Sequence, residues 1–197
     1  MPESAYELAK KNPELRPRLE PAIMKDPRFA YFYAAIVIKR RWPEAEPYIM
    51  KDPQYAYHYV LNLIGARRGW PEAEPYIMKD PHWAYLYAVE VLRRPWPEAE
   101  PFFMKDPDYA YAYAKNVLER RWPEAEPYIM KDPQYAYWYA RYVLKRPWPE
   151  AEPYIMKDPE CAYHYAEHVL KRRWPEAELY IMKDKRMWNR YKRRFKL

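Results

Sequence analysis

The sequence predicts an all-α protein, an α-solenoid of tandem helix–turn–helix repeats of about 26 residues. The phrase Trp-Pro-Glu-Ala-Glu-Pro-Tyr-Ile-Met-Lys-Asp-Pro recurs along the chain, and its Asp returns every 26 residues except for one step of 28. Each copy also carries apolar residues at helical spacing. A fixed period of this length is typical of stacked helical elements that bury their apolar faces against neighbours. We name each repeat after this Asp, counted as position 0: Asp26, Asp52, Asp80, Asp106, Asp132, Asp158 and Asp184.

The longer helix of each repeat is predicted to begin at the Asp-Pro pair, as at Asp52-Pro53. Asp is a favourable N-cap because its carboxylate accepts hydrogen bonds from the free amides of the first turn. Proline fits the first helical position. Ala at positions 4 and 8, Tyr at 5 and 7, and Val-Leu at 11 and 12 fall on one wide apolar arc. We expect Ala at the centre of this arc and Tyr at its flanks, where the hydroxyl finds water or a backbone partner.

The shorter helix is predicted in the Pro-Glu-Ala-Glu-Pro-Tyr-Ile-Met-Lys segment, as in residues 43–51. Acidic residues near its start and Lys at its end suit the helix dipole. Pro47 lies one turn into the segment, so a tight first turn of the 3₁₀ type is expected there. Trp42 and Ile49 should pack against the longer helices, and the short connections favour antiparallel neighbours.

Residues 1–197 are predicted to form a single repeat domain. Residues 1–15 would be an N-terminal partial repeat, 16–184 the tandem repeats, and 185–197 a basic C-terminal capping helix. Atypical terminal repeats are expected because their outer faces meet water. The step of 28 residues contains both glycines, Gly65 and Gly69, so a two-residue insertion should lengthen a helix end or a turn there.

The composition excludes several classes of protein. A disordered chain would lack the 23 Tyr and nine Trp found here. No apolar run is long enough to span a bilayer, and no signal peptide is expected. Cys161, the single cysteine, can form no internal disulfide, which favours a reducing, cytoplasmic compartment. We expect Cys161 to be a small buried thiol rather than a nucleophile.

The repeated Arg-Trp-Pro-Glu-Ala-Glu-Pro-Tyr-Ile-Met-Lys-Asp-Pro-x-Tyr-Ala-Tyr-x-Tyr-Ala phrase resembles arrays in uncharacterised bacteriophage proteins, over about residues 16–184. The resemblance implies an intracellular setting in a bacterium or a phage-infected bacterium, and it brings no catalytic residue. Copies this regular would also arise from a consensus design. The layout is similar to tetratricopeptide-type solenoids, although the repeat is shorter.

The sequence predicts neither an enzyme nor a cofactor. Ser4 is the only serine, and two glycines cannot form a phosphate-binding loop. The Glu-x-Glu pairs, such as Glu44 and Glu46, recur in six equivalent copies. Acid/base catalysis needs two carboxylates in different environments, and six equivalent copies argue against one such special pair. We expect these acids to pair with the Arg-rich turn before each Trp.

No bound metal is expected. The methionine that ends each short helix is explained by packing. His164 and His168 lie four residues apart on one helix, a spacing that suits two ligands of a divalent cation. No third ligand is evident beyond Glu160 or Glu167, so the sequence favours a chance placement on a solvated face.

The leading hypothesis is a non-catalytic binding or scaffold protein that binds a protein partner. Positions 2, 6, 9, 10 and 13 vary between copies and fall on the arc opposite the apolar one, which should face solvent. A monomer is expected, with end-to-end structural self-assembly as one alternative. The candidate partner-binding residues are Phe32, His58, Leu86, Trp138, Tyr142 and His164.

The other alternative is nucleic-acid binding by the C-terminal segment. Residues 185–197 carry seven of the 35 basic residues and no acid, so the other 28 basic residues match the 28 acidic ones. Trp188, Tyr191 and Phe195 lie between these charges and could stack on bases. The segment could equally contact another anionic partner or a membrane surface, or form a solvated capping helix. The candidate anion-binding residues are Lys185, Arg186, Arg190, Lys192, Arg193 and Arg194.

Overall fold

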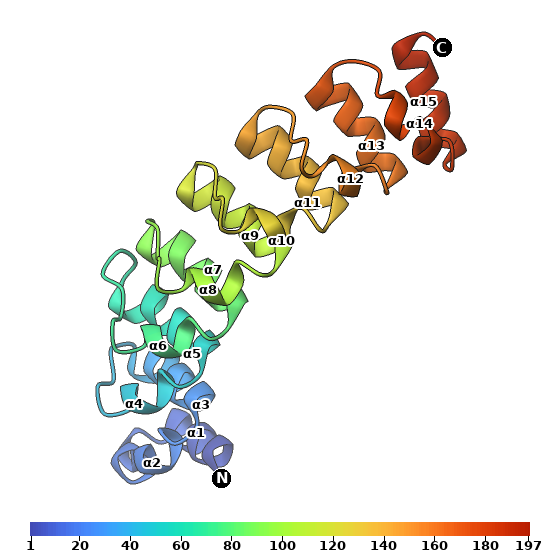
Figure 1. Ribbon diagram of the computed structural model, residues 1–197. Helices are drawn as coiled ribbons and strands as arrows, with labels where there is room; N and C mark the ends of the chain where they lie inside the picture. Colours follow the sequence, from blue (N-terminus) through green and yellow to red (C-terminus); the bar gives the residue numbers. More distant parts are fainter. The chain divides into compact units, whose positions relative to one another are not determined.

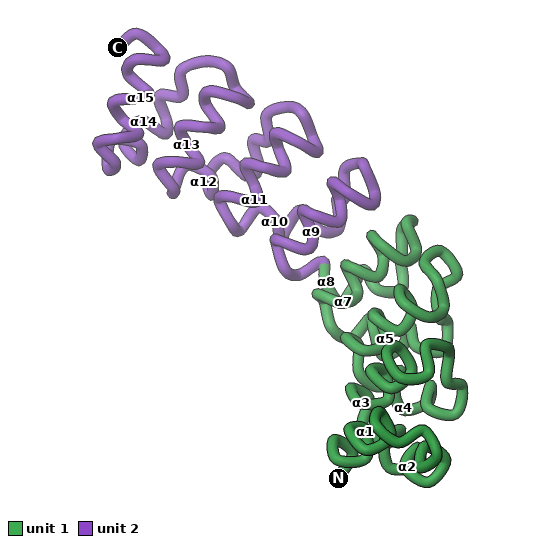
Figure 2. The backbone as a smooth tube through the Cα atoms, turned by 180° about the vertical axis from the view of Figure 1, so that it is seen from behind, with its two compact units in different colours: residues 1–103 green, residues 104–197 purple.

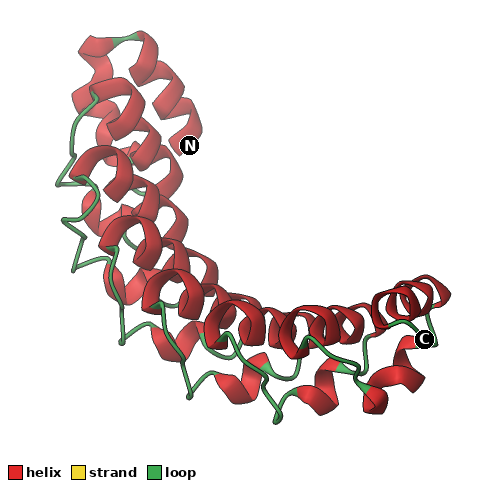
Figure 3. Cartoon of the chain, turned by 90° about the horizontal axis from the view of Figure 1, so that it is seen from above, coloured by secondary structure: helices red, strands yellow, loops and turns green.

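A computed structural model describes all 197 residues, and every regular element in it is helical (Figures 1 and 3). The predicted all-α repeat architecture is confirmed. The longer helices are α1 (Pro2–Lys11), α3 (Pro27–Phe32), α5 (Pro53–Tyr59), α7 (Pro81–Leu86), α9 (Pro107–Tyr113), α11 (Pro133–Trp138), α13 (Pro159–Tyr165) and α15 (Lys185–Phe195). The shorter helices are α2 (Arg16–Ile23), α4 (Glu46–Ile49), α6 (Glu74–Ile77), α8 (Glu100–Phe103), α10 (Glu126–Ile129), α12 (Glu152–Ile155) and α14 (Pro175–Ile181). None of these helices combines the length and apolar character that crossing a membrane requires.

The chain forms two compact units, unit 1 (Met1–Phe103) and unit 2 (Met104–Leu197), coloured separately in Figure 2. In unit 1, α3 packs against α5 and α5 against α7. In unit 2, α9 packs against α11, α11 against α13, and α13 against α15. Within each unit the shorter helices pack against the longer ones, so each unit is a stack of helical pairs.

The Asp-Pro pairs begin the longer helices as predicted. One carboxylate oxygen of Asp52 accepts hydrogen bonds from the backbone N–H groups of Gln54 at 3.0 Å and Tyr55 at 3.2 Å. Asp52 itself has extended backbone angles, and Pro53 is the first helical residue. Such a cap is worth about 1 kcal/mol, and all seven aspartates adopt the same extended conformation.

The second half of most longer helices differs from the α-helix that the pattern predicts. It continues as a π-helical segment in Tyr33–Ile38, Val60–Ile64, Tyr87–Leu92, Ala114–Leu118, Tyr139–Leu144 and Ala166–Leu170. The hydrogen bonds show the wider turn: the Gly65 N–H donates to the carbonyl of Val60, five residues earlier, at 2.7 Å. Most of these segments end at a left-handed residue such as Lys39, Arg93 or Lys171. The Val-Leu pair suits an apolar face in either kind of helix, so periodicity did not reveal the wider turn.

The shorter helices have the tight first turn that the second proline predicts. The Ala45 N–H donates to the carbonyl of Trp42 at 3.0 Å, three residues back, and Tyr48 N–H donates to Ala45 in the same way at 2.9 Å. The α-helical part of the segment is then only the four residues of α4. The helix is short because Pro47 can donate no backbone hydrogen bond.

The two-residue insertion lengthens a turn and leaves the helix before it unchanged. The π-helical segment after α5 ends at Ile64, and the inserted residues form a turn in which Arg67 N–H donates to the carbonyl of Val91 at 2.9 Å. Gly69 closes the turn with a φ of +68°. A Cβ at Gly69 would lie 3.3 Å from the hydroxyl of Tyr87. This close approach and the positive φ both favour glycine.

The core of each repeat combines small and very large side chains. Ala110 and Ala114, at positions 4 and 8, are fully buried, as expected for the centre of the apolar arc. Tyr113, at position 7, is also fully buried, and so is every tyrosine at that position. The prediction that these tyrosines lie at the flanks was wrong for position 7. Burial there is tolerated because the hydroxyl has hydrogen-bond partners within the protein.

Candidate functional site

The position-7 tyrosine is the centre of a hydrogen-bond network that links several residues fixed in the repeat. The backbone N–H of Trp42 donates to the hydroxyl oxygen of Tyr59 at 2.6 Å, and that hydroxyl donates to Glu46 at 2.9 Å. Arg41 completes the network with two hydrogen bonds to Glu46, both 2.9 Å. Burial raises the pKa of Tyr59, so its hydroxyl stays protonated and able to donate.

The second Glu of each Glu-x-Glu pair therefore has a structural role. The expected pairing with arginine is found where Arg precedes the Trp, as between Arg121 and Glu126 at 2.6 Å. It also occurs in the pairs Arg41–Glu46 and Arg173–Glu178. Pro95 and Pro147 hold the equivalent place in two other repeats, which lack this arginine. The first Glu of each pair, such as Glu44, is exposed.

The candidate partner-binding residues at position 6 are half-buried, not freely exposed. Phe32, His58, Leu86, Trp138 and His164 all belong to this class. Three of these rings contact the tyrosine at position 5 of the preceding repeat. Tyr31 lies 6.0 Å from His58, Tyr111 lies 5.7 Å from Trp138, and Tyr137 lies 6.2 Å from His164, measured between ring centroids. The expectation of a solvent-facing arc was wrong at position 6, where these side chains are half-buried, and this tyrosine covers part of His58, Trp138 and His164.

Position 10 is more exposed, and it also reaches the preceding repeat. The Tyr57 hydroxyl donates to Glu90 at 2.7 Å, and the Asn62 amide donates to the Tyr31 hydroxyl at 2.8 Å. Tyr142 keeps 42% of its surface exposed. Positions 6 and 10 therefore form one stripe along the longer helices of each unit, which we call the variable stripe.

In unit 2 the variable stripe is hollowed into a groove of 580 Å³ between α11 and α13. Its floor and walls combine aromatic, basic and acidic groups on adjacent repeats. Two of the candidate partner-binding residues, Trp138 and His164, line it, whereas Tyr142 lies beside it. The residues that line the groove include Trp138, Arg141, Glu160, Cys161, His164 and His168.

Arg141 is the free cation of this groove. Its guanidinium donates a hydrogen bond to the Tyr137 hydroxyl and lies 5.0 Å from the centroid of the Tyr142 ring. Lys115 approaches the same Tyr142 ring to 5.1 Å. Arg141 forms no ion pair, so its charge is offset only by aromatic faces and solvent.

Cys161 is buried beside the groove, as the sequence predicted. Burial raises the pKa of its thiol, and the nearby carboxylate of Asp158 raises it further. A thiol in this state is a poor nucleophile at neutral pH. Its backbone N–H donates to Asp158 at 2.8 Å, so Cys161 belongs to the helix cap.

His164 and His168 are neighbours on one helical face. Their rings are stacked, with centroids 5.6 Å apart and planes 5° from parallel. Glu167 lies beside both rings, and the carboxylate oxygen Oε2 is 3.4 Å from His168 Nε2. Burial lowers the pKa of both histidines, and Arg141 lowers it further. Both imidazoles are therefore neutral at neutral pH.

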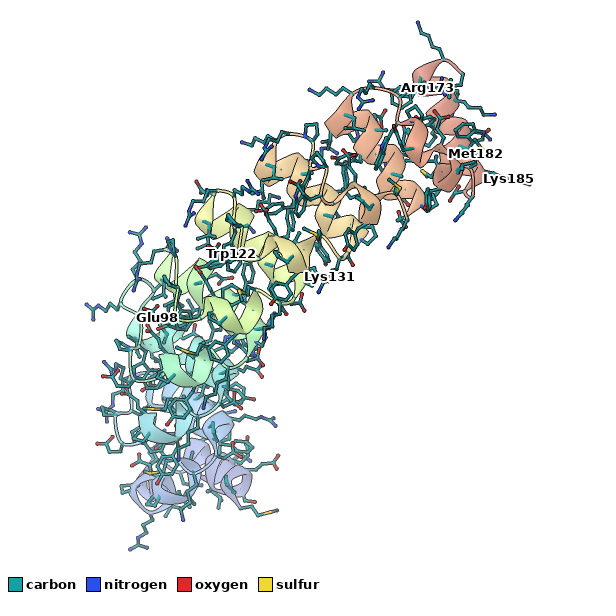
Figure 4. All side chains as sticks on the ribbon, viewed as in Figure 1. Glu98, Trp122, Lys131, Arg173, Met182 and Lys185 are labelled. Carbon is teal, nitrogen blue, oxygen red and sulfur yellow. The ribbon has the colours of Figure 1, made fainter.

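The basic residues of α15 divide between two environments. Arg186, Arg190 and Arg194 occupy positions 2, 6 and 10 of the Asp184 repeat and face α13. Arg194 lies 3.3 Å from Glu167, and Arg190 lies 5.0 Å from the Tyr163 ring centroid. Lys185 and Arg193 are exposed like these three arginines but form no ion pair or cation–π contact, and Figure 4 shows Lys185 at the C-terminal end of the array.

The aromatic residues of this segment serve the cap of the repeat stack. Tyr191 is fully buried, accepts the Trp174 N–H at 2.7 Å and donates to Glu178 at 3.1 Å. The expectation that Tyr191 could stack on bases was therefore wrong. Trp188 is half-buried against Tyr191, with ring centroids 5.6 Å apart.

Comparisons of the chain with protein families, with curated proteins and with solved structures gave no match. The resemblance to phage repeat arrays stays a prediction, and the assignment of candidate residues depends on the geometry of this chain alone.

Proposed function

We propose that the protein is a non-catalytic binding or scaffold protein that holds a protein partner on the variable stripe of unit 2. The fixed residues of each repeat are used for capping and packing, as the network of Tyr59, Trp42 and Glu46 illustrates. The stripe is one of the places where the repeats differ from one another. The observation that carries the proposal is the groove between α11 and α13, with Arg141 unpaired in its wall.

The chemistry of the groove favours an acidic segment that also carries an apolar or aromatic side chain. Arg141 and Lys115 place two positive charges around the Tyr142 ring. Arg141 presents planar donors to a carboxylate of the partner and forms no ion pair, although three carboxylates also line the groove. Trp138 offers a large half-buried ring, and aromatic and arginine residues are frequent centres of binding energy.

The repeat itself supplies a matched variant for the test. The Asp106 repeat carries Ala112, Lys115 and Asn116 where the groove carries Trp138, Arg141 and Tyr142. The triple substitution W138A/R141K/Y142N therefore installs residues that this fold already accepts. A photo-crosslinking amino acid at position 142, introduced in the native host, should capture a protein that the same probe at Lys157 does not capture. Equal capture at both positions would refute the proposal.

Nucleic-acid binding by α15 is a second candidate, favoured by the exposed Lys185 and Arg193 in a segment without acids. Deleting the segment would also remove Tyr191, which caps the stack. The better variant is K185Q/R193Q/K196Q, which changes exposed charges only. Binding to DNA or RNA that falls steeply with salt and weakens in this variant would support the candidate. Weak binding that is the same in both proteins would exclude it.

A further inference from the structure

Three side chains from consecutive turns converge at the edge of the groove. His164 belongs to α13, and Glu167 and His168 belong to the π-helical segment that follows. One potential ligand atom from each lies within 4.8 Å of the other two. His164 Nδ1 is 3.8 Å from Glu167 Oε2, and His168 Nε2 is 3.4 Å from the same oxygen.

These separations suit a single metal ion. Ligand atoms about 2.1 Å from a tetrahedral zinc ion lie about 3.4 Å from one another. The distance from His168 to Glu167 already matches this value, and the distance from His164 is slightly longer. The third separation, between His164 and His168, is within 4.8 Å, so the side chains would have to rotate to bring the three atoms to one ion.

We propose that His164, Glu167 and His168 bind a divalent transition-metal ion, with Zn²⁺ as the expected ion. Two imidazoles and one carboxylate are a ligand set that zinc accepts, and it leaves a coordination position for water. Copper and nickel ions also bind imidazole. The neighbouring groove, which both histidines line, gives the ion access from solvent.

The burial of one potential ligand atom supports the proposal. The Nδ1 atom of His164 is buried and has no hydrogen-bond partner. An unpaired buried ring nitrogen is unfavourable, and a bound ion would give this atom a partner.

The surrounding charges leave one oxygen of Glu167 for the ion. Arg194 from α15 lies 3.3 Å from Oε1, whereas both histidines face Oε2. Arg194 can therefore orient the carboxylate, as groups behind a metal ligand commonly do. Arg141 from α11 and Arg190 from α15 oppose a cation, and Glu160 favours one.

The test is a calorimetric titration of the full chain with Zn²⁺ alone. The variants H164A and H168N carry the residues found at Ala112 and Asn116 of the Asp106 repeat, so both suit the fold. We expect wild type to bind one ion through this site and each variant to bind it at least about tenfold more weakly. Zn²⁺ should also raise the thermal unfolding midpoint of wild type but not of H168N.

Two further variants separate this site from other zinc ligands. His58 occupies position 6 like His164, but Leu61 and Asn62 follow it, so H58A should bind Zn²⁺ as wild type does. C161A should also bind normally, because the thiol is outside the proposed ligand set. The proposal would be overturned by equal affinity in wild type, H164A and H168N. It would also be overturned by loss of binding in H58A or C161A. None of these titrations contains a protein partner, so their outcome is independent of the proposed function.

Discussion

The backbone N–H of Trp148 donates to the hydroxyl oxygen of Tyr165, 2.7 Å away, and the same hydroxyl donates to Glu152 at 3.1 Å. The Tyr165 ring also lies against Trp174, with centroids 5.1 Å apart. One buried tyrosine thus contacts the tryptophan that precedes the shorter helix α12 and the tryptophan that follows its own longer helix. This relationship recurs along the chain and explains why the repeat fixes Trp, Tyr and the second Glu together.

Replacing Tyr165 by Phe should destabilise the protein by about 1–3 kcal/mol, because the Trp148 N–H would be buried without an acceptor. The free energy of unfolding in urea measures the effect. Tyr154 is half-buried on the short helix, and Y154F is the control, with an expected change within about 0.5 kcal/mol. Equal stability of Y165F and wild type would contradict the role given to the hydroxyl.

Replacing Asp52 by Ala should lower stability by about 1 kcal/mol, because two amides of the first turn of α5 lose their acceptor. Asn can accept the same hydrogen bonds, so D52N should unfold close to wild type. Denaturation curves of the two variants separate the cap from the charge. If D52N lost as much stability as D52A, the cap would not be the cause.

Replacing Gly65 or Gly69 by Ala should destabilise the protein for different reasons. Gly65 has a φ of 104° and a ψ of 134°, a conformation that residues other than glycine rarely adopt. Gly69 has a φ of 68°, which Ala adopts at about 1 kcal/mol or more of strain, and its added Cβ would lie 3.3 Å from the Tyr87 hydroxyl. Thermal unfolding should show a loss for both G65A and G69A, and an unchanged midpoint for either variant would argue against the strain assigned to it.

The stability of unit 2 should fall as the pH drops below about 6.5, the ordinary histidine pKa. Burial lowers the pKa of His164 and His168 in the folded chain, so the unfolded chain binds protons first. Stability then rises with pH through the interval between the folded and unfolded pKa values. Glu160 and Glu167 oppose this lowering, whereas Arg141, Arg190 and Arg194 reinforce it.

Urea midpoints between pH 5 and pH 8, measured with a chelator present, check this dependence. The variant H164A/H168N should lose the part of the pH dependence that the two histidines cause. An unchanged profile would show that other groups are responsible.

The regular part of the fold was accessible to sequence reasoning because it depends on local chemistry. Asp52 and Pro53 favour the start of a helix through their own side chains. A small residue such as Ala110, at the centre of the apolar arc, indicates a close contact between helices. The π-helical turns and the burial of Tyr59 were not predicted. Both depend on contacts between helices, which periodicity does not specify.

The candidate site was predicted only in part for the same reason. The sequence marked Trp138 and His164 as variable, but it could not show that Tyr111 and Tyr137 cover one side of each. The spacing of His164 and His168 could be read from the sequence, whereas only the structure shows that Glu167 lies beside both rings. Positions 2, 6 and 10 of α15 continue the same stripe, and counting from Asp184 could have revealed this.

The most direct test of the proposed binding function is the dissociation constant of the partner captured by a probe at position 142. It should be measured for wild type and for W138A/R141K/Y142N, with K185Q/R193Q/K196Q as the control for α15. We predict binding at least about tenfold weaker in the groove variant, because it loses Trp138, Tyr142 and the planar donors of Arg141. We predict no change in the control. Equal affinity in the groove variant and wild type would contradict the account.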